Sequence, residues 1–349
     1  MSSSPSTRNK IQTIQEIIGQ DDGDRGMKAL IVPGDLEKAA TFLTSLLSQH
    51  DDTTNQPKPC HIVILSGFPC CVDQTPPTET DGPPGTIAIA KCILALGKHH
   101  HVTIVTDDCN KVVFEAAIGN EEDEAENSHE KNTIQLETFP PEQHMKEEDY
   151  NRMKLISSQC DLLVACERAG PGSDGKCYTM RGIDMTAKGL IAPLHQIVDM
   201  IRNKPQKDQK KVYFIAIGDG GNELGMGKVI DKIRTNPKIP NGNLIGAVTS
   251  ADYLIAASVS NWGGYALAAA CALVKSDMQD DEGEQNLINW VGKCVPTTQH
   301  EIDLLDRCVN AGCRDGVSGK MESTVDGMPL QTSLDCLQKI ITCCLKEGE

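Results

Sequence analysis

Short apolar runs rich in β-branched residues alternate with longer segments of helical periodicity, and this alternation restricts the fold more than any other feature. The short runs predict buried strands at 61–67, 102–107, 162–167, 212–218 and 243–248. The longer segments predict helices at 36–49, 85–97, 192–203 and 264–275. Strands that alternate with helices in this way are typical of an α/β fold, with a mostly parallel sheet and helices on both faces.

The length of the chain and its content of apolar residues favour one large domain. The chain has 349 residues, of which 39% are hydrophobic, so it can bury a large core. We expect a single α/β domain over 1–349, with polar, mobile loops at 49–59 and 119–132 and a helical C-terminal region at 284–349. A Gly/Asp-rich loop or hairpin is expected within that region, at 313–329.

The charge of the chain excludes several classes of partner. The formal net charge is -16, which repels phosphate backbones and anionic membrane surfaces, so we expect neither nucleic acid nor membrane as a partner. No apolar run reaches the length of a membrane span. The first ten residues lack the apolar core of a secretory signal, which favours an intracellular location in the cytoplasm or the mitochondrial matrix.

The 15 cysteines point to a reducing compartment and not to a metal site. No two of them have C-x-x-C spacing, so the usual zinc and thioredoxin signatures are missing. Many lie inside apolar runs, where a reduced thiol behaves as a small apolar side chain. Cys70 and Cys71 follow an expected strand and could be exposed, but the sequence disfavours a catalytic thiol there because it offers no convincing histidine partner.

Each predicted strand is followed by a polar, glycine-bearing loop. Because the carboxyl ends of parallel strands meet at one edge of a sheet, these loops are expected to surround a single small-molecule pocket. The candidate substrate-binding residues outside the glycine-rich turn described next are Asp81, Gly82, Asp107, Asp174 and Arg181. Arg181 could hold a substrate carboxylate through two hydrogen bonds. We assign Glu167, Asp108 and Asp252 to turns, helix caps or surface ion pairs.

The stretch IAIGDGGNELGMG at 215–227 places two carboxylates in one glycine-rich turn. Gly220 and Gly221 permit a sharp turn, Asn222 is expected to cap a helix that begins near Glu223, and the N–H groups there would bind an anion. Asp219 and Glu223 are the candidate catalytic groups. A dinucleotide fingerprint fails because Glu223 stands where a glycine is required.

Two further motifs fail for similar reasons. A P-loop that ends at 227–228 would need glycine at Asn222 and Ser or Thr at Val229. A nucleophile elbow around Ser173 has Pro171 in place of its first glycine. The sequence therefore disfavours a nicotinamide enzyme, a P-loop NTPase and a serine hydrolase.

Five blocks together resemble the D-glutamate cyclase family, in the domain that forms the C-terminal part of the animal enzyme. They are SGFPC at 66–70, ETDGPPG at 79–85, TDD at 106–108, ERAGPGSDGKCYTMRG at 167–182 and IGDGGNELGMG at 217–227. The resemblance runs from about Ile11 to the C-terminal tail. It implies a Rossmann-like fold and a hydro-lyase that converts D-glutamate to 5-oxo-D-proline and water. The animal enzyme also has an N-terminal domain, for which this chain has no room.

For such a reaction, Asp219 and Glu223 would transfer protons, the turn at 220–222 would bind the anion, Arg181 would hold the α-carboxylate and Asp81 the ammonium. Two alternatives stay open. Mg²⁺ or Mn²⁺ bound by Asp81, Asp107 and Asp219 would support a lactam or amide hydrolase. A third possibility is a protein that binds a small ligand without chemistry. The sequence requires no cofactor, leaves the metal question open and is compatible with a homo-oligomer.

Overall fold

A computed structural model describes residues 3–21, 24–51, 53–97, 99–119, 134–203, 211–279 and 283–346. The expected mobile loop at 119–132 lies outside these residues, apart from Gly119. In the other expected loop, at 49–59, His50 and Pro57 form an isolated antiparallel bridge.

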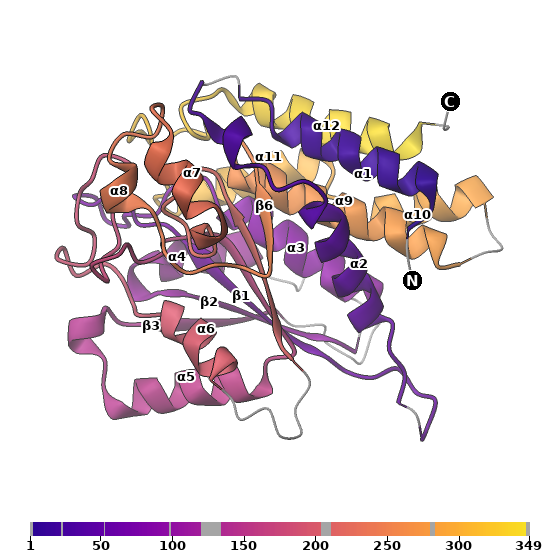
Figure 1. The fold of residues 1–349 in the computed structure, drawn as a ribbon, viewed down its shortest axis with the longest axis horizontal. Helices are drawn as coiled ribbons and strands as arrows, with labels where there is room; N and C mark the ends of the chain where they lie inside the picture. The colour runs from indigo at the N-terminus through magenta and orange to yellow at the C-terminus, as the bar shows by residue number, and fades with distance from the viewer. Residues whose placement is uncertain are drawn as a thin grey trace.

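Six parallel strands form one sheet at the centre of the molecule (Figure 1). The strands are β1 (His61–Gly67), β2 (His101–Asp107), β3 (Ile134–Phe139), β4 (Leu162–Arg168), β5 (Tyr213–Gly218) and β6 (Tyr253–Ala256). Their spatial order is β3-β2-β1-β4-β5-β6, and every pairing is parallel. The expected Rossmann-like α/β fold is confirmed. The strand order reverses between β1 and β4, which is where ligands bind in such sheets.

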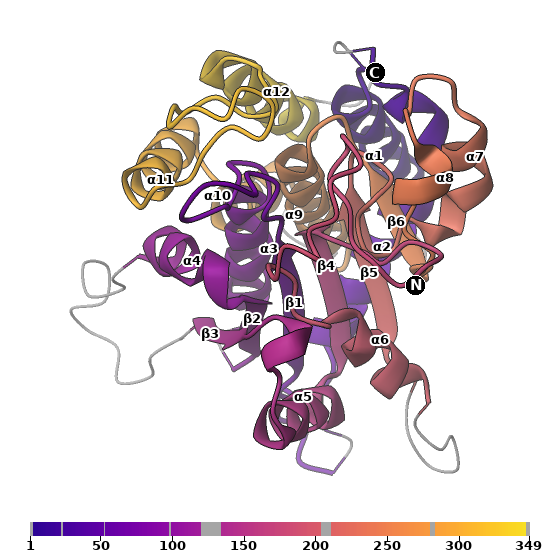
Figure 2. The same ribbon diagram turned by 90° about the vertical axis from the view of Figure 1, so that its left-hand side faces the viewer.

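Alternate side chains of each strand enter two separate cores, one on each face. In β1, Ile62 and Ile64 belong to the larger core, whereas Val63 and Leu65 belong to the smaller one. Because both faces are covered, the strands read as continuous apolar runs. Helices α5 (Glu147–Gln159) and α6 (His195–Arg202) lie on the side of the sheet opposite α3 (Pro83–Leu96) and α9 (Ser260–Asp277) (Figure 2).

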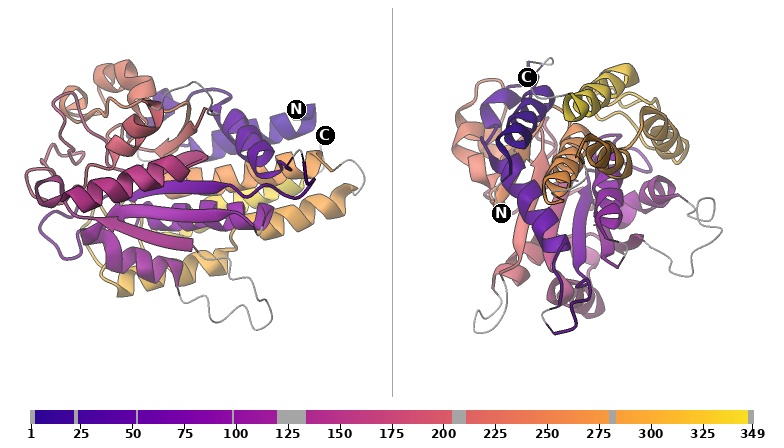
Figure 3. Two further views of the ribbon diagram at one scale, coloured as in Figure 1. Left: turned by 90° about the horizontal axis from the view of Figure 1, so that it is seen from below. Right: turned by 90° about the vertical axis from the view of Figure 1, so that its right-hand side faces the viewer.

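The larger core is built around α9, which is buried along its length from Ser260 to Val274. Helices on the same side of the sheet contribute to this core and are α1 (Pro5–Ile18), α2 (Asp35–Leu47), α4 (Lys111–Ile118), α10 (Gly283–Cys294), α11 (Thr298–Asn310) and α12 (Leu330–Leu345). Helices α1 and α12 lie side by side (Figure 3), and Lys10 Nζ donates to the carbonyl oxygen of Cys344 at 2.8 Å.

The amino ends of α3 and α9 lie very close to each other at one edge of the sheet. A Cβ atom on Gly264 would lie 2.6 Å from the Cα atom of Gly85, so only glycine fits there. The two helix starts are therefore held together directly beyond the carboxyl end of the sheet.

Two of the strand assignments differ from the prediction. The apolar run at 243–248 is not a strand, because Gly242–Ile245 forms the short helix α8, and the sixth strand is instead the four-residue β6. A Cβ on Gly242 would lie 2.4 Å from the carbonyl oxygen of Ile233, so this segment packs against α7 (Ile230–Thr235) instead of joining the sheet. The edge strand β3 was missed because its burial is only partial and its apolar signal is correspondingly weak.

No helix in the described part of the chain combines the length with the apolar character that a membrane crossing requires. The C-terminal region contains α10, α11 and α12. The segment between α11 and α12 is a loop without regular helices, as the Gly/Asp-rich composition at 313–329 indicated.

Candidate functional site

Buried carboxylates gather beyond the carboxyl ends of β1, β4 and β5. Asp81 lies in the loop after β1, Glu167 lies near the end of β4, and Asp219 directly follows β5. Each of the three is at most 4% exposed. The sequence prediction that separate loops meet at this edge is therefore supported for Asp81 and Asp219.

Asp219 lies between two groups of acids. One oxygen from each of Asp81, Asp219 and Asp326 lies within 4.8 Å of the others, and the same holds for Glu167, Asp219 and Glu223. Asp326 comes from the loop between α11 and α12, which the sequence did not connect with the pocket. We call these five residues the acidic cluster.

Asp81 is held by the amino end of α9. Its Oδ2 accepts from the Ser260 N–H at 2.8 Å, and its Oδ1 accepts from the Asn261 N–H at 2.8 Å and from the Gly82 N–H at 3.0 Å. The Asn261 Oδ1 in turn accepts from the N–H groups of Gly82 and Gly85, each at 2.9 Å. A carboxylate at a helix amino end is stabilised by the helix dipole, so these bonds fix Asp81 in place.

Glu167 was assigned to a surface or turn role, and that assignment is wrong. The residue is buried, and its Oε2 accepts from the Ser260 hydroxyl at 2.5 Å. Its φ is 45°, a left-handed conformation that is uncommon for residues other than glycine. Strained backbone of this kind persists where surrounding contacts hold it, and it is frequent at functional sites. The sequence carried no signal for this conformation.

The glycine-rich turn after β5 binds a carboxylate of the protein itself. The Gly220 N–H donates to Glu223 Oε1 at 2.6 Å, and the Gly221 N–H donates to Glu223 Oε2 at 2.8 Å. These are the N–H groups expected to bind a substrate anion, and Glu223 already occupies them.

The predicted helix start at Glu223 is also wrong. Leu224 N–H donates to the Arg168 carbonyl oxygen at 2.7 Å, so the chain pairs with the end of β4 instead of coiling. The side-chain amide of Asn222 donates to the Tyr178 carbonyl oxygen at 2.8 Å and does not cap a helix. The first regular helix after the turn is α7, which begins at Ile230.

Arg25 supplies the cation of the acidic cluster, and the sequence analysis missed it. Its Nη2 lies 3.0 Å from Asp219 Oδ2, and its Nη1 lies 2.8 Å from Asp326 Oδ2. The Arg25 side chain is 29% exposed, whereas the two carboxylates are 5% and 8% exposed, so the guanidinium covers them from the solvent side. The backbone here is held by Asp21, whose carboxylate accepts from the Arg25 N–H at 2.8 Å. The only available signal was the Gly/Asp-rich composition of 21–26.

Burial raises the pKa values of four acids of the cluster: Asp81, Glu167, Asp219 and Asp326. Burial raises the pKa of Asp81 to about 8, and the nearby Asp326 adds to the effect. Burial raises the pKa of Asp219 to about 7, although Arg25 lowers it and Asp81 raises it further. Burial and neighbouring carboxylates also raise the pKa of Glu167 and Asp326 well above the ordinary range. The site can therefore present both a carboxylate and a carboxylic acid at pH 7.

Three of the predicted binding residues lie apart from these acids. Asp107 forms a buried ion pair with Arg168, and its Oδ1 also accepts from the Ala192 N–H at 2.7 Å. Both oxygens of Asp107 thus have structural partners. Asp174 is exposed and accepts from the Tyr178 hydroxyl at 2.6 Å.

Arg181 is exposed as well, and its Nη2 donates to the Val317 carbonyl oxygen at 2.9 Å. Among the described residues, no ion pair connects Arg181 to the acidic cluster. The structure therefore offers Arg25, and not Arg181, as the guanidinium beside Asp219.

The acidic cluster offers the oxygen ligands that a hard divalent cation prefers. Carboxylate oxygens are the preferred ligands of Mg²⁺, Mn²⁺ and Ca²⁺, and each of the two groups around Asp219 offers three of them. Asp107, which the sequence placed in such a site, belongs to neither group. Each group contains one acid whose two oxygens already accept backbone hydrogen bonds, Asp81 in the first and Glu223 in the second, so these bonds do not favour one group over the other.

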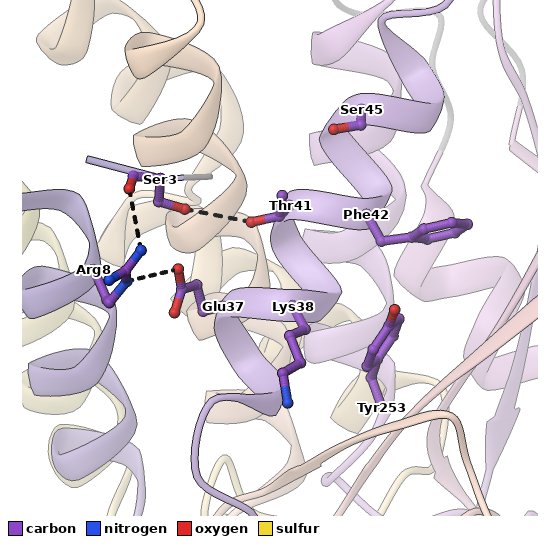
Figure 4. A pocket seen from close by; sticks show the side chains of 8 residues that line it. All are labelled: Ser3, Arg8, Glu37, Lys38, Thr41, Phe42, Ser45 and Tyr253. Atoms are coloured by element: carbon purple, nitrogen blue, oxygen red, sulfur yellow. Dashed lines mark hydrogen bonds and ion pairs between the residues drawn. The ribbon is translucent and has the colours of Figure 1, made fainter. Parts of the chain in front are cut away.

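A separate hollow with a volume of about 480 Å³ lies between α2, the start of α1 and Tyr253 of β6 (Figure 4). It is lined by Ser3, Arg8, Glu37, Lys38, Thr41, Phe42, Ser45 and Tyr253. Tyr253 is the first residue of its strand, so this hollow lies at the amino end of the sheet. None of its residues belongs to the acidic cluster, and their chemistry is that of an ordinary mixed surface.

Two comparisons with known proteins identify the family of the chain. The family model described as D-glutamate cyclase-like, C-terminal matches residues 14–341. The human protein named "D-glutamate cyclase, mitochondrial" is 31% identical over 350 residues, an alignment that covers 97% of this chain and 52% of the human protein. The chain thus spans about half the length of this relative. It belongs to the D-glutamate cyclase-like C-terminal domain family.

Proposed function

We propose that this chain is a hydro-lyase that closes D-glutamate to 5-oxo-D-proline with loss of water. The family and the name of the human relative support the substrate. The observation that carries the chemistry is Asp219, a buried acid with a pKa of about 7, which lies between other carboxyl groups and contacts one guanidinium. A group with this pKa can accept or donate a proton at neutral pH.

The reaction has three chemical requirements. The α-ammonium must lose a proton before its nitrogen attacks the carbon of the γ-carboxyl group. An oxygen of that carboxyl group must then leave as water, so an acid must protonate it. The substrate also carries a second carboxylate, which must be bound away from the reacting carbon.

The acidic cluster provides groups for each requirement. Asp219 is the proposed general base, and Asp81, whose pKa of about 8 keeps it mostly protonated at neutrality, is the proposed general acid. Arg25 is the proposed anchor of the α-carboxylate, because a guanidinium has five N–H donors and the bonds to Asp219 and Asp326 use two of them. Glu223 holds the turn through Gly220 and Gly221, so we assign it to positioning and not to proton transfer.

A chiral product assay tests this function. Purified chain is incubated with D-glutamate, L-glutamate and both enantiomers of 5-oxoproline, and the products are separated on a chiral column. We expect 5-oxo-D-proline from D-glutamate. Asp219→Asn should lower turnover by roughly 10²- to 10⁴-fold, the usual contribution of a general base.

The matched control is Asp73→Asn, because the Asp73 carboxylate is 76% exposed and pairs with Lys188 at the surface. Both variants should retain the circular dichroism spectrum and unfolding midpoint of the parent chain. Wild-type turnover in a folded Asp219→Asn variant would exclude the proposed base. Ligand-induced thermal stabilisation without product would instead favour a protein that binds the ligand without catalysis.

The second candidate is a metal-dependent lactam or amide hydrolase. Asp81, Asp219 and Asp326 would hold Mg²⁺ or Mn²⁺, and the cation would polarise a carbonyl group and lower the pKa of a bound water. Titration calorimetry with Mn²⁺ alone, on the parent chain and on Asp326→Asn, tests binding independently of activity. Activity that EDTA removes and one metal restores would favour this candidate over metal-free acid–base catalysis.

We also propose an intracellular location, in the mitochondrial matrix or the cytoplasm. The name of the human relative and the 15 cysteines, present here as thiols, support it. Fractionation of cells that express the chain with a C-terminal tag would test it.

A further inference from the structure

Two adjacent thiols lie on the loop that connects β1 to the acidic cluster. Cys70 and Cys71 follow the strand by three and four residues, and their Sγ atoms are 4.0 Å apart. Both residues are partly exposed. The Cys71 N–H donates to the Pro77 carbonyl oxygen at 3.0 Å, so the loop folds back on itself before it reaches Asp81.

The surroundings make the two thiols unequal. A hydrogen bond from the Cys70 thiol lowers the pKa of Cys71, and the positive charges of Arg314 and Arg181 lower it further. The hydrogen bond with Cys71, burial and the neighbouring Glu79 all raise the pKa of Cys70. The partly exposed Cys71 sulfur is therefore the nucleophile of the pair, since the thiolate is the reactive form.

We propose that Cys70 and Cys71 are a redox modification site that closes to a vicinal disulfide when it reacts with a small-molecule disulfide such as oxidised glutathione. The sulfur atoms must approach from 4.0 Å to about 2.0 Å, which requires rotation of the two side chains and distortion of the peptide unit between them. The Cα atoms of adjacent residues are about 3.8 Å apart, closer than in most disulfides, so the closed ring is strained and readily reduced.

The exchange balances in two steps. The Cys71 thiolate attacks one sulfur of oxidised glutathione, forms a mixed disulfide and releases one glutathione thiolate. The Cys70 thiol then loses its proton to water, and its sulfur attacks the Cys71 sulfur and expels the second glutathione thiolate. Two electrons pass from the protein thiols to the glutathione disulfide.

Disulfide formation would affect the acidic cluster through the loop after β1, which carries Cys70, Cys71 and Asp81. A Cβ on Gly316 would lie 2.0 Å from Glu79 Oε2 and 3.1 Å from Cys70 Sγ, so Cys70 and Glu79 share one tightly packed position under the loop between α11 and α12. The Cys71 sulfur also contacts the Asp315 carbonyl oxygen of that loop at 4.0 Å. Closing the disulfide moves both sulfur atoms and so disturbs Glu79, two residues before Asp81.

Peptide mapping after alkylation tests the proposal without any activity measurement. The full chain is equilibrated with oxidised glutathione, its remaining thiols are alkylated, and its peptides are identified by mass spectrometry. We expect loss of alkylation at both Cys70 and Cys71, a direct disulfide between them, and recovery of both sites after dithiothreitol. Cys70→Ser should instead accumulate glutathione on Cys71, because the resolving thiol is absent.

The matched control within the same chain is the other adjacent pair, Cys343 and Cys344, which lies in α12. Of these two, only Cys343 is partly exposed, and the pair should remain alkylated. If Cys70 and Cys71 both stay alkylated, or if wild-type Cys71 retains glutathione without closing the ring, the proposal is wrong. A fall in cyclase activity on oxidation rests on the proposed function as well, so the mapping result separates the failure of one proposal from that of the other.

Discussion

Glu301 lowers the stability of the folded chain above acidic pH, and its replacement by glutamine should remove that loss. The residue is fully buried in α11, beside Tyr265 of α9. Neither carboxyl oxygen of Glu301 makes a hydrogen bond of ordinary geometry with any described residue, so the Tyr265 hydroxyl offsets the effect of burial only in part. Burial raises the pKa of Glu301 from 4.5 to about 7.

The size and sign of the effect follow from this shift. Between pH 4.5 and about pH 7, folded Glu301 keeps the proton that it releases in the unfolded chain, so the free energy of unfolding falls as pH rises. The difference of about 2.5 pKa units, at 1.36 kcal/mol each, corresponds to roughly 3 kcal/mol. The contribution is intact below pH 4.5, lost by about pH 7 and constant above that value.

Urea denaturation of the parent chain and Glu301→Gln at half-unit steps from pH 4.5 to 8 measures the effect. Glutamine has nearly the same shape and does not titrate, so the stability difference in its favour should grow by about 3 kcal/mol over this range. Glu322→Gln is the control, since the Glu322 side chain is 53% exposed. If the curves for the parent chain and Glu301→Gln run parallel, Glu301 has no raised pKa and the reasoning fails.

Two further substitutions separate the site from the scaffold. Arg25→Gln removes the cation that lowers the pKa of Asp219. The acidic limb of the pH profile of kcat/KM should therefore move to higher pH while the fold is retained. An unchanged limb would exclude Asp219 as the titrating base. Asp107→Asn leaves the guanidinium of Arg168 without its buried partner and should lower the free energy of unfolding by about 3–5 kcal/mol, measured by urea denaturation. A loss below about 1 kcal/mol would show that this ion pair does not hold the loops after β2 and β4 together.

The elements that the sequence predicted well are those whose burial is uniform. Strands β1, β2, β4 and β5 are buried almost throughout, so their apolar runs are unbroken. The run at 243–248 has the same composition but packs against α7, because Gly242 permits an approach that composition does not encode. The edge strand β3 was missed for the opposite reason, since a half-buried strand can contain polar residues and then lacks a continuous apolar run.

The sequence by itself determined the parallel α/β architecture and the edge at which Asp81 and Asp219 meet, because hydrophobic periodicity fixes the strands and parallel strands share their carboxyl ends. Only the tertiary structure decided which charges stand beside them. Arg25 and Asp326 come from opposite ends of the chain, whereas Arg181, which lies within one of the motifs, donates to the Val317 carbonyl oxygen. Ion pairs and raised pKa values depend on distances of a few ångströms and on exclusion of water, and neither quantity is a property of a local stretch of sequence.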